Sequence, residues 1–271
     1  MVEKYRDYIE NISKNTGFIG STLEKVDRLI RILEWMNSDE KLNKLLALKG
    51  GTAINTAIFN FPRLSVDIDL DLTENLSKEE MIKERENIHN LLVNYLNSNN
   101  YKINMEKSKN VYALDSIVAE YIDIKGNIDN IKIEINYMNR VHILETKRID
   151  VSTDVLKGKH LTIHCIHPIE IYAAKLCALL SRTTARDLYD VYTLSKYDLF
   201  DDEEKKLLKQ CLMLEYIAVN DYKLKDMKID NVERLKRQDI KTKLLPTLKD
   251  RNPKNSNIDE MKQAVREYLK D

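Results

Sequence analysis

Three aspartates alternate with apolar residues in the run Ser-Val-Asp-Ile-Asp-Leu-Asp-Leu, which spans Ser65–Leu72. This alternation is typical of a β-strand with one face in the core, so Asp67, Asp69 and Asp71 are expected on the other face. Carboxylates in a row repel one another unless a cation or open water compensates them. Two or three carboxylates held by a rigid sheet form the hard-oxygen environment that Mg²⁺ prefers. The strand is therefore a candidate for metal chemistry.

A glycine pair, Gly50-Gly51, precedes this strand in a chain that has only six glycines. Glycine lets the backbone approach a phosphate closely, and the short helix expected after the pair offers free N–H groups and a positive dipole end. The hydroxyl of Thr52 could add a donor. Taken alone, a glycine pair is usually a turn, and alternating aspartates are most often a solvated sheet face. The combination is more specific than either part.

A second strand is expected over Ile131–Tyr137, with isoleucines on one face and Lys132, Glu134 and Asn136 on the other. If this strand lies beside the aspartate strand, Glu134 joins the aspartates as a third candidate metal ligand. Paired metal ions can stabilise both the attacking and the leaving oxygen of a phosphoryl displacement. A solvent-exposed face would accommodate Lys132 and Asn136 equally well, so that alternative stays open.

Lys175 is the only charged residue in the apolar stretch Ile171–Leu180, a helix that otherwise favours burial all round. A lysine there must extend its amino group to solvent, pair with an acid or meet a ligand phosphate. Asp187 and Asp190 on the next expected helix are candidate acids. Lys175 could also do both in turn, first pairing with an acid and then leaving that acid to contact a bound triphosphate. Arg186 and Asp190 are four residues apart, so ordinary pairing along a helix explains part of this cluster.

A zinc site is suggested by His160, His164, Cys165 and His167, which lie close together in the sequence. On a strand, however, His164 and His167 point to opposite faces, and no Cys-x-x-Cys accompanies them, so we do not expect zinc there. His167 is expected instead to precede a helix beginning at Pro168, because proline suits the first helical position.

Composition narrows the class of protein. The 271 residues carry 44 basic and 44 acidic side chains, so the formal net charge is zero. Any surface that binds nucleic acid must therefore be a local basic patch. No apolar run approaches the length of a membrane span, and the charged N-terminus has no signal-peptide core. Cys165, Cys177 and Cys211 are widely spaced in apolar context, which indicates buried free thiols in a reducing cytoplasm. We therefore expect a cytoplasmic protein without membrane contact.

Hydrophobic periodicity divides the chain into three stretches. Residues 1 to about 48 are expected to be helical, with a capping box at Ser21–Glu24 and Trp35 in the core. From about 49 to 166, helix and strand alternate. In this middle stretch we expect a helix capped by Ser77–Glu80, a hairpin at Gly126-Asn127, and strands around 101–106, 117–124, 131–137, 142–149 and 161–166. Helices follow over 168–181, 184–196 and 202–216, and a last one starts at Ser256–Asp259.

The region from Lys223 to Arg251 is locally basic. Its cations are Lys223, Lys225, Lys228, Arg234, Lys236, Arg237, Lys241, Lys243, Lys249 and Arg251, against the acids Asp226, Asp230, Glu233, Asp239 and Asp250. Such a surface can steer a phosphate backbone, although a solvated helix face explains it at least as well. No aromatic stacking pattern accompanies the cations, so reading of single-stranded bases is not predicted.

In order along the chain, Gly-Gly-Thr, Arg-x-Ser-x-Asp-x-Asp, a helix with a central lysine, and Arg-Asp-x-x-Asp resemble the AbiEii/AbiGii nucleotidyltransferase toxins of the DNA polymerase β-like superfamily. The resemblance covers roughly residues 45–195. It implies an α+β fold with a nucleotidyltransferase-type mixed β-sheet flanked by helices, followed by a helical C-terminal domain. The expected domains are 1–166, with the catalytic sheet, and 167–271, a helical domain closing the nucleotide cleft.

The resemblance also implies roles for individual residues. The family's metal-binding acids fall on Asp67 and Asp69, and its first-motif glycines on Gly50 and Gly51. Ser65 matches a serine important in related toxins. The remaining assignments are Lys175 as the nucleotide-contacting lysine and Asp187, with Asp190, as the later acidic site. The superfamily's Gly-Ser pair is Gly51-Thr52 here, which retains a hydroxyl, and Arg63 either contacts phosphate or flanks a sheet edge.

Together these features predict a Mg²⁺-dependent (or Mn²⁺-dependent) nucleotidyltransferase that transfers NMP from an NTP to an acceptor hydroxyl. Family resemblance suggests an RNA acceptor such as the 3′ end of tRNA, and a bacterial toxin or abortive-infection effector with a cognate antitoxin. A catalytically inactive nucleotide- or RNA-binding protein of the same fold is the alternative, and a metal-dependent nuclease is a third interpretation.

Overall fold

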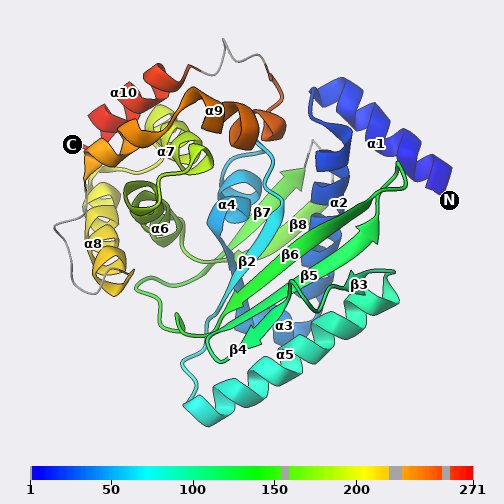
Figure 1. Cartoon of the computed structure of the whole chain (residues 1–271). Coiled ribbons are helices and arrows are strands. Elements are labelled where there is room, and N and C mark those ends of the chain that lie inside the picture. Colours follow the sequence, from blue (N-terminus) through cyan, green and yellow to red (C-terminus); the bar gives the residue numbers. More distant parts are fainter. Residues whose placement is uncertain (1, 154–158, 220–227, 252–256, 271) are drawn as a thin grey trace. The chain divides into compact units, whose positions relative to one another are not determined.

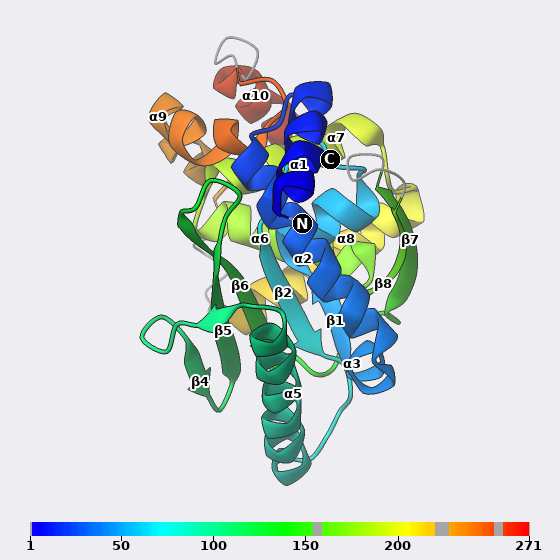
Figure 2. The ribbon, with the colours of Figure 1, turned by 90° about the vertical axis from the view of Figure 1, so that its right-hand side faces the viewer.

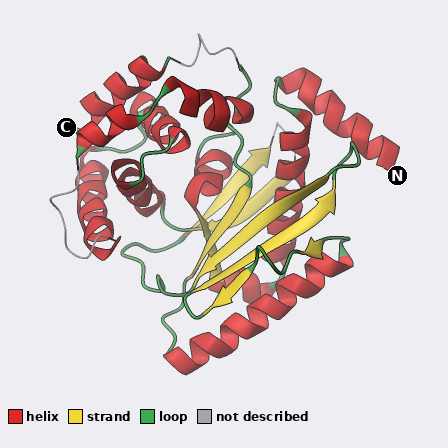
Figure 3. Ribbon diagram, in the orientation of Figure 1, coloured by secondary structure: helices red, strands yellow, loops and turns green. Residues whose placement is uncertain are grey.

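A computed structural model describes residues 2–153, 159–219, 228–251 and 257–270 (Figure 1). The chain divides into two compact units, Met1–Ile166 and His167–Asp271. All strands of the described chain lie in the first unit, and the described part of the second unit is helical (Figure 3). The expected α+β fold, a mixed sheet flanked by helices, is confirmed.

The first unit is built on an eight-stranded mixed sheet in the order β3-β5-β6-β2-β1-β8-β7, with β4 paired to β5. Its strands are β1 (Leu46–Lys49), β2 (Asp67–Leu72), β3 (Lys102–Ile103), β4 (Lys109–Val111), β5 (Leu114–Ile122), β6 (Ile128–Asn136), β7 (Lys147–Thr153) and β8 (Lys159–Cys165). Its helices are α1 (Val2–Thr16), α2 (Gly20–Ser38), α3 (Glu40–Leu45), α4 (Gly50–Thr52), the π-helix η1 (Ala53–Ile58) and α5 (Lys78–Ser98).

One face of this sheet is apolar and is covered by α2 and α5 (Figure 2). Ile68 and Leu70 of β2 are fully or almost fully buried on that face. An ion pair joins α2 to this face of the sheet, with Lys25 Nζ 3.0 Å from Asp129 Oδ1 of β6. Because side chains alternate along β2, Asp67, Asp69 and Asp71 lie on the opposite face, as the alternation predicted.

Helices α2 and α5 contact each other through an aromatic pair. The rings of Trp35 and Tyr95 stack with their centroids 3.9 Å apart and their planes 12° from parallel. The prediction that Trp35 lies in the core is wrong, since its side chain is only half-buried. The indole supplies apolar area to the helix pair while its edge stays near solvent, a common arrangement for tryptophan.

Helix α2 begins before the predicted capping box. Its N-cap is Ile19, which makes no side-chain cap bond, so the capping box at Ser21–Glu24 is wrong. The reason is that Glu24 is fully buried and has other partners. Its carboxylate accepts two bonds from Arg28, at 3.0 and 2.9 Å, and one from the backbone N–H of Ile124 at 2.9 Å.

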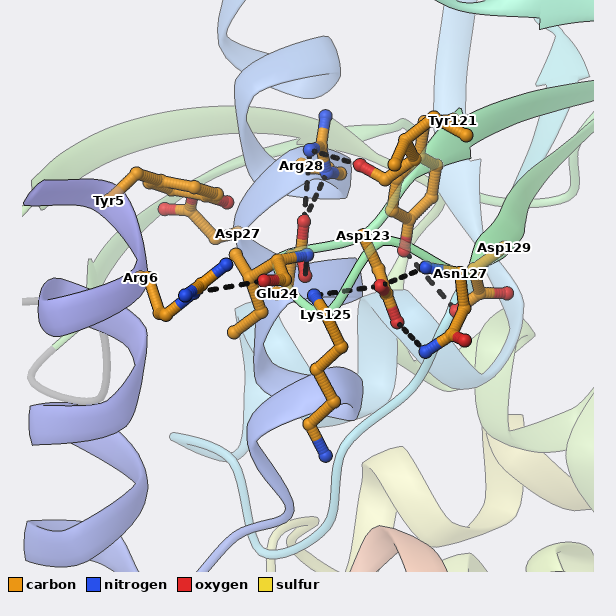
Figure 4. Close-up of polar contacts among 12 residues, drawn as sticks. Tyr5, Arg6, Glu24, Asp27, Arg28, Tyr121, Asp123, Lys125, Asn127 and Asp129 are labelled. Carbon is orange, nitrogen blue, oxygen red and sulfur yellow. Dashed lines mark hydrogen bonds and ion pairs between the residues drawn. The ribbon is translucent and has the colours of Figure 1, made fainter. Parts of the chain in front are cut away.

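These contacts tie α2 to the β5–β6 hairpin (Figure 4). The predicted hairpin is confirmed, with Gly126 in the left-handed region at φ 88°. Asp123 closes the turn by accepting bonds from the backbone N–H groups of Lys125 and Asn127. Arg6 of α1 donates to the Ile124 carbonyl at 3.0 Å, so both N-terminal helices hold the turn.

Glu24→Ala is expected to lower the free energy of unfolding by about 3 kcal/mol, because the Ile124 N–H and the Arg28 guanidinium lose their buried acceptor. Urea denaturation followed by circular dichroism measures the change. Glu24→Gln keeps an acceptor oxygen, so its loss should be smaller. Equal losses for the two variants would show that the charge, and not the acceptor, stabilises this turn.

The second unit contains α6 (Pro168–Ser181), α7 (Ala185–Tyr197), α8 (Asp202–Val219), η4 (Ile229–Arg234), α9 (Arg237–Asp239), η5 (Ile240–Leu244), η6 (Leu245–Thr247) and α10 (Ile258–Tyr268). Helix α6 begins at Pro168 as predicted, and the His167 side chain caps it by accepting from the Ile169 N–H. Helix α10 is capped by Asn257, whereas Ser256 lies outside the described residues. The Ser77–Glu80 capping box of α5 is also present.

Two sheet predictions need correction. The stretch up to about residue 48 was expected to be helical, yet Leu46–Lys49 is a central strand, β1. The strand expected at 142–149 is displaced toward the C-terminus, to Lys147–Thr153. Both errors arise because short apolar runs carry too little periodicity to distinguish helix from strand or to set the ends of a strand. Among the described helices, none is long and apolar enough to cross a membrane.

Candidate active site

The aspartates of β2 lie between two different neighbours. Strand β6 runs parallel on one side and places Glu134 opposite Asp69 and Lys132 opposite Asp67. Strand β1 runs antiparallel on the other side and places Lys49 opposite Asp69. Residues paired in register point to the same face of a sheet. The structure therefore places Asp67, Asp69 and Glu134 on one face, as the sequence predicted for adjacent strands.

Two lysines compensate part of this acidic face. Lys49 Nζ lies 2.5 Å from Asp71 Oδ1, and the Asp71 side chain is almost completely buried. Lys132 Nζ lies 2.9 Å from Glu134 Oε2, in a pair that is partly exposed on both sides. The compensating cations required by a row of acids thus come from the neighbouring strands, and Lys49 was not recognised from the sequence.

Gly50 lies directly against the acidic face. Its φ is +68°, a region that side-chain-bearing residues rarely adopt. A Cβ atom at this position would stand 2.5 Å from Asp69 Oδ2 and 3.2 Å from Asp69 Cβ. Both the backbone conformation and the carboxylate of Asp69 therefore require glycine, and the glycine turn and the acid form one local structure.

Gly50→Ala is expected to lower stability by about 1–2 kcal/mol and to abolish most of the nucleotidyl transfer that the resemblance implies, because the methyl group would displace the Asp69 carboxylate. Gly126→Ala is the matched control, since Gly126 also has positive φ but a Cβ there meets nothing within 4 Å. Thermal melts and initial transfer rates compare the two. Similar activity loss in both variants would mean that backbone strain alone is responsible.

The predicted residues Arg63 and Ser65 fill the space beside Gly51 that a side chain would need. A Cβ on Gly51 would lie 3.0 Å from Arg63 Nη2 and 3.1 Å from Ser65 Oγ. Arg63 is 2 % exposed and donates from Nη1 to the Leu64 carbonyl at 3.0 Å, while Ser65 is also buried. Because Arg63 is buried behind the glycine turn, its position favours support of the turn. A direct contact between its guanidinium and a phosphate would require the turn to move.

The hydroxyl of Thr52, the third predicted member of the glycine turn, has another partner in this structure. It donates to the backbone carbonyl of Asp67, and the Thr52 side chain is fully buried. The Thr52 carbonyl in turn accepts from the Thr56 hydroxyl. Thr52 thus joins the start of β2 to the glycine turn, which positions Asp67 relative to Gly50.

The donor chemistry at this face suits a hard divalent cation. Asp67 and Asp69 are both half-buried on one strand, alternate residues of which lie about 7 Å apart. Within the described residues, no group of three or more His, Cys, Asp or Glu side chains is arranged to hold a metal ion. Mg²⁺ is commonly bound by one or two carboxylates together with substrate phosphates, so two aspartates fit this mode of binding.

The histidines likewise form no zinc site among the described side chains. His164 is held by the Asn43 carbonyl at 2.9 Å and by the Thr146 hydroxyl at 2.7 Å. Burial and the nearby Arg148 lower the pKa of His164, so the neutral imidazole is favoured. The side chain of His160 lies outside the described residues. Cys165, Cys177 and Cys211 are buried free thiols, as predicted.

The second unit gathers the predicted Lys175 and its acids. Lys175 Nζ lies 2.9 Å from Asp187 Oδ1 and 3.1 Å from Asp190 Oδ2, and all three side chains are buried. Arg182 was not recognised from the sequence. Its guanidinium donates to both carboxylate oxygens of Asp187, at 3.0 and 3.1 Å. Its position at the end of α6, five residues before Asp187, was the available signal.

Asp187 is held in its charged form. Burial alone would raise the pKa of its carboxyl, but Lys175 and Arg182 outweigh burial and place the pKa far below its usual range. The Thr184 hydroxyl donates a further bond at 2.8 Å. The structure therefore contains the buried pair that the sequence offered as the alternative to a ligand contact, and this state is compatible with later release of the lysine.

A family model described as "Nucleotidyl transferase AbiEii toxin, Type IV TA system" matches residues 31–270 of this chain. The chain belongs to this family. AbiEii proteins are nucleotidyltransferase toxins of toxin–antitoxin systems, so this chain is a nucleotidyltransferase and the resemblance read from its motifs is confirmed. No curated protein matches the chain.

Solved structures resemble this AbiEii protein in fold. MenT4, a nucleotidyltransferase toxin from Mycobacterium tuberculosis, aligns with a TM-score of 0.64 at 14% identity, over 96% of this chain and 87% of MenT4. JHP933 from Helicobacter pylori aligns with a TM-score of 0.49 at 19% identity, over 93% of this chain and 95% of that protein. The first of these likenesses shows a shared fold.

Proposed function

We propose that this AbiEii protein is a metal-dependent enzyme that transfers NMP from an NTP to a hydroxyl group of an RNA acceptor. The observation that carries the proposal is the face shared by Asp67, Asp69 and the glycine turn. A Cβ on Gly50 would collide with the Asp69 carboxylate, so the glycine turn lies directly against a candidate metal ligand. The backbone of such a turn can approach a phosphate closely.

In this proposal Asp67 and Asp69 bind Mg²⁺ or Mn²⁺, with Glu134 as a third ligand. A bound divalent cation supplies charge neutralisation of the triphosphate and a lower pKa for the attacking hydroxyl. The turn at Gly50 and Gly51 binds phosphate oxygens through backbone N–H groups. Ser65 and Arg63 support that turn from behind, since both lie within 3.1 Å of a Cβ built on Gly51.

Lys175 is proposed to neutralise negative charge on the leaving pyrophosphate. Support comes from its surroundings in the second unit, where it is buried against Asp187 and Asp190. The two carboxylates hold the Lys175 side chain in one orientation before any ligand arrives. Asp187 would then act as the residue that positions Lys175.

The RNA acceptor, such as the 3′ end of tRNA, is proposed from the family resemblance and from the basic segment of the second unit. Its exposed cations in the described chain include Arg234, Lys236, Arg237, Lys241, Lys243, Lys249 and Arg251. The apolar residues of the same segment, among them Val232, Ile240 and Leu244, are buried, which leaves the cations on the surface. Lys223 and Lys225 lie outside the described residues.

Lys241→Gln combined with Arg251→Gln is expected to weaken RNA binding and to lower the slope of log K against log salt by about one per residue. Fluorescence anisotropy with labelled tRNA over graded salt measures this slope. Lys206→Gln, a change at an exposed cation of α8, is the control and should leave the slope unchanged. Equal effects of both variants would point to a general loss of positive charge.

The transfer reaction itself is tested with purified protein, Mg²⁺, total RNA and each of the four NTPs labelled at the α-phosphate. Label should enter RNA with one or more NTPs, and should disappear with EDTA. The same NTPs labelled at the γ-phosphate should give no label, which distinguishes nucleotidyl from phosphoryl transfer. Periodate oxidation of the RNA removes the 3′ hydroxyl and should block labelling if that hydroxyl is the acceptor.

The alternatives give different results. A nucleotide-binding protein without activity would retain NTP but label no RNA. A metal-dependent nuclease would shorten the RNA with no need for NTP. A cognate antitoxin and a cytoplasmic location complete the proposal, and the three free buried cysteines accord with a reducing compartment. Protection of cells by a neighbouring gene product would identify the antitoxin.

A further inference from the structure

Strands β2 and β6 contribute four carboxylates to the acidic face of the sheet, and two of these form ion pairs that differ in burial. Asp67, Asp69 and Asp71 come from β2, and Glu134 comes from β6. Asp71 is paired with Lys49 and Glu134 with Lys132. Among the described residues, these two lysines are the cations that β1 and β6 place in register with the aspartates. Glu134 is therefore both a member of an ion pair and a candidate metal ligand.

The two pairs differ in burial. The Asp71 side chain is 4% exposed and that of Lys49 29%, so Asp71 cannot easily exchange its partner for water. In the second pair, Lys132 is 41% exposed and Glu134 is 30% exposed. Partly exposed pairs of this kind stabilise a protein weakly, because water competes for both charges. The Lys132–Glu134 pair is therefore the one that a ligand can open.

Lys132 lies next to both Asp67 and Glu134, which are candidate metal ligands. Lys132 is the register partner of Asp67, and Glu134 is the register partner of Asp69. Lys132 is thus the neighbour of Asp67 across the strands and the ion-pair partner of Glu134. A divalent cation held by Glu134 would compete with the Lys132 ammonium group for the same carboxylate. The ammonium group, once displaced, lies at a site that binds a triphosphate in the proposed function.

We propose that Lys132 holds the Glu134 carboxylate in an ion pair until the metal and nucleotide bind, and that Lys132 then contacts the nucleotide. Glu134 exchanges Lys132 for the cation, and Lys132 turns to the anionic phosphates of the nucleotide. Metal and nucleotide binding are then coupled through this one side chain, and the coupling is reciprocal. This inference rests on the proposed function, because it assigns Glu134 to the metal site.

The first test measures Mn²⁺ binding by electron paramagnetic resonance, without nucleotide. The proteins compared are the wild type, Lys132→Met, Glu134→Gln and the double variant. Lys132→Met should bind Mn²⁺ about threefold to fivefold more tightly, because the Glu134 carboxylate is freed from its ion pair. In the Glu134→Gln background the same lysine change should have little effect. Lys102→Met, at an exposed lysine of β3, controls for net charge.

The second test measures steady-state transfer at saturating metal. Lys132→Met should raise KM for the NTP several-fold, since the nucleotide loses a cation, and should change kcat much less. A charge-preserving Lys132→Arg variant should restore KM. A residue with only a structural role would not separate KM from kcat in this way.

Several results would overturn the inference. One is a gain in Mn²⁺ affinity that persists unchanged in the Glu134→Gln background, since Lys132 would then act by repulsion alone. Unaltered Mn²⁺ affinity in Lys132→Met is another, and an unaltered KM would remove the nucleotide contact. If Asp67→Asn also leaves Mn²⁺ binding at the wild-type level, the proposed metal site itself fails, which distinguishes that failure from failure of Lys132 alone.

Discussion

Asp67→Asn and Asp69→Asn are each expected to reduce the initial rate of NMP transfer by about 10²–10³-fold, with little change in stability. Both side chains are half-buried on the acidic face of β2, and an amide keeps their size while removing the charge that binds a divalent cation. The rate is measured as incorporation of α-phosphate label into RNA, and thermal melts by circular dichroism report the fold.

Asp71→Asn is the matched control for these two variants. Asp71 lies on the same strand and face, but its carboxylate is buried and paired with Lys49 at 2.5 Å. Its loss should cost about 1–3 kcal/mol of stability and reduce transfer less than tenfold. If Asp71→Asn were as inactive as the other two, the whole acidic row, and not two metal ligands, would be required. Wild-type activity in Asp67→Asn would refute the assignment.

Lys175→Met is expected to lower the free energy of unfolding by about 3–5 kcal/mol and to slow NMP transfer strongly. Removing the ammonium group leaves Asp187 and Asp190 facing each other in a buried environment, a costly arrangement. Arg182 still pairs with Asp187 at 3.0 Å, which keeps the loss within this range. Urea denaturation measures stability, and label incorporation measures transfer.

The double variant Lys175→Met/Asp190→Asn separates the two proposed roles of the lysine. Neutralising Asp190 removes one of the two buried negative charges that Lys175 balances, so stability should return in part. Transfer should not return, because the cation for pyrophosphate is still missing. Recovery of both properties would mean that Lys175 is only a counter-ion. Lys196→Met, at an exposed lysine of α7, controls for loss of a positive charge.

Local rules account for the parts of the fold that were predicted correctly. Alternation set the inward and outward faces of β2 and β6, because successive side chains on a strand point to opposite sides. Pro168 set the start of α6, and Gly126 set the β5–β6 turn, because few backbone conformations are open to proline and few residues adopt positive φ. Each of these features depends on residues within a few positions of one another.

The errors concern residues whose surroundings come from distant parts of the chain. Leu46–Lys49 was placed with the helices, yet it is a central strand because β2 and β8 pair with it on either side. Glu24 was assigned to a helix cap, yet it is buried against Ile124, a hundred residues away. A pattern of apolar and polar residues does not specify such a partner.

The candidate site shows the same division. The sequence alone predicted that the three aspartates share one face and that a glycine turn precedes them. It also offered Lys175 as a buried cation near Asp187 and Asp190. Only the tertiary structure decided that Lys49 neutralises Asp71 and that Gly50 lies against Asp69. Alternation along a strand is a local steric property, whereas the partner of a charge is chosen by strand order, which brings together residues far apart in the chain.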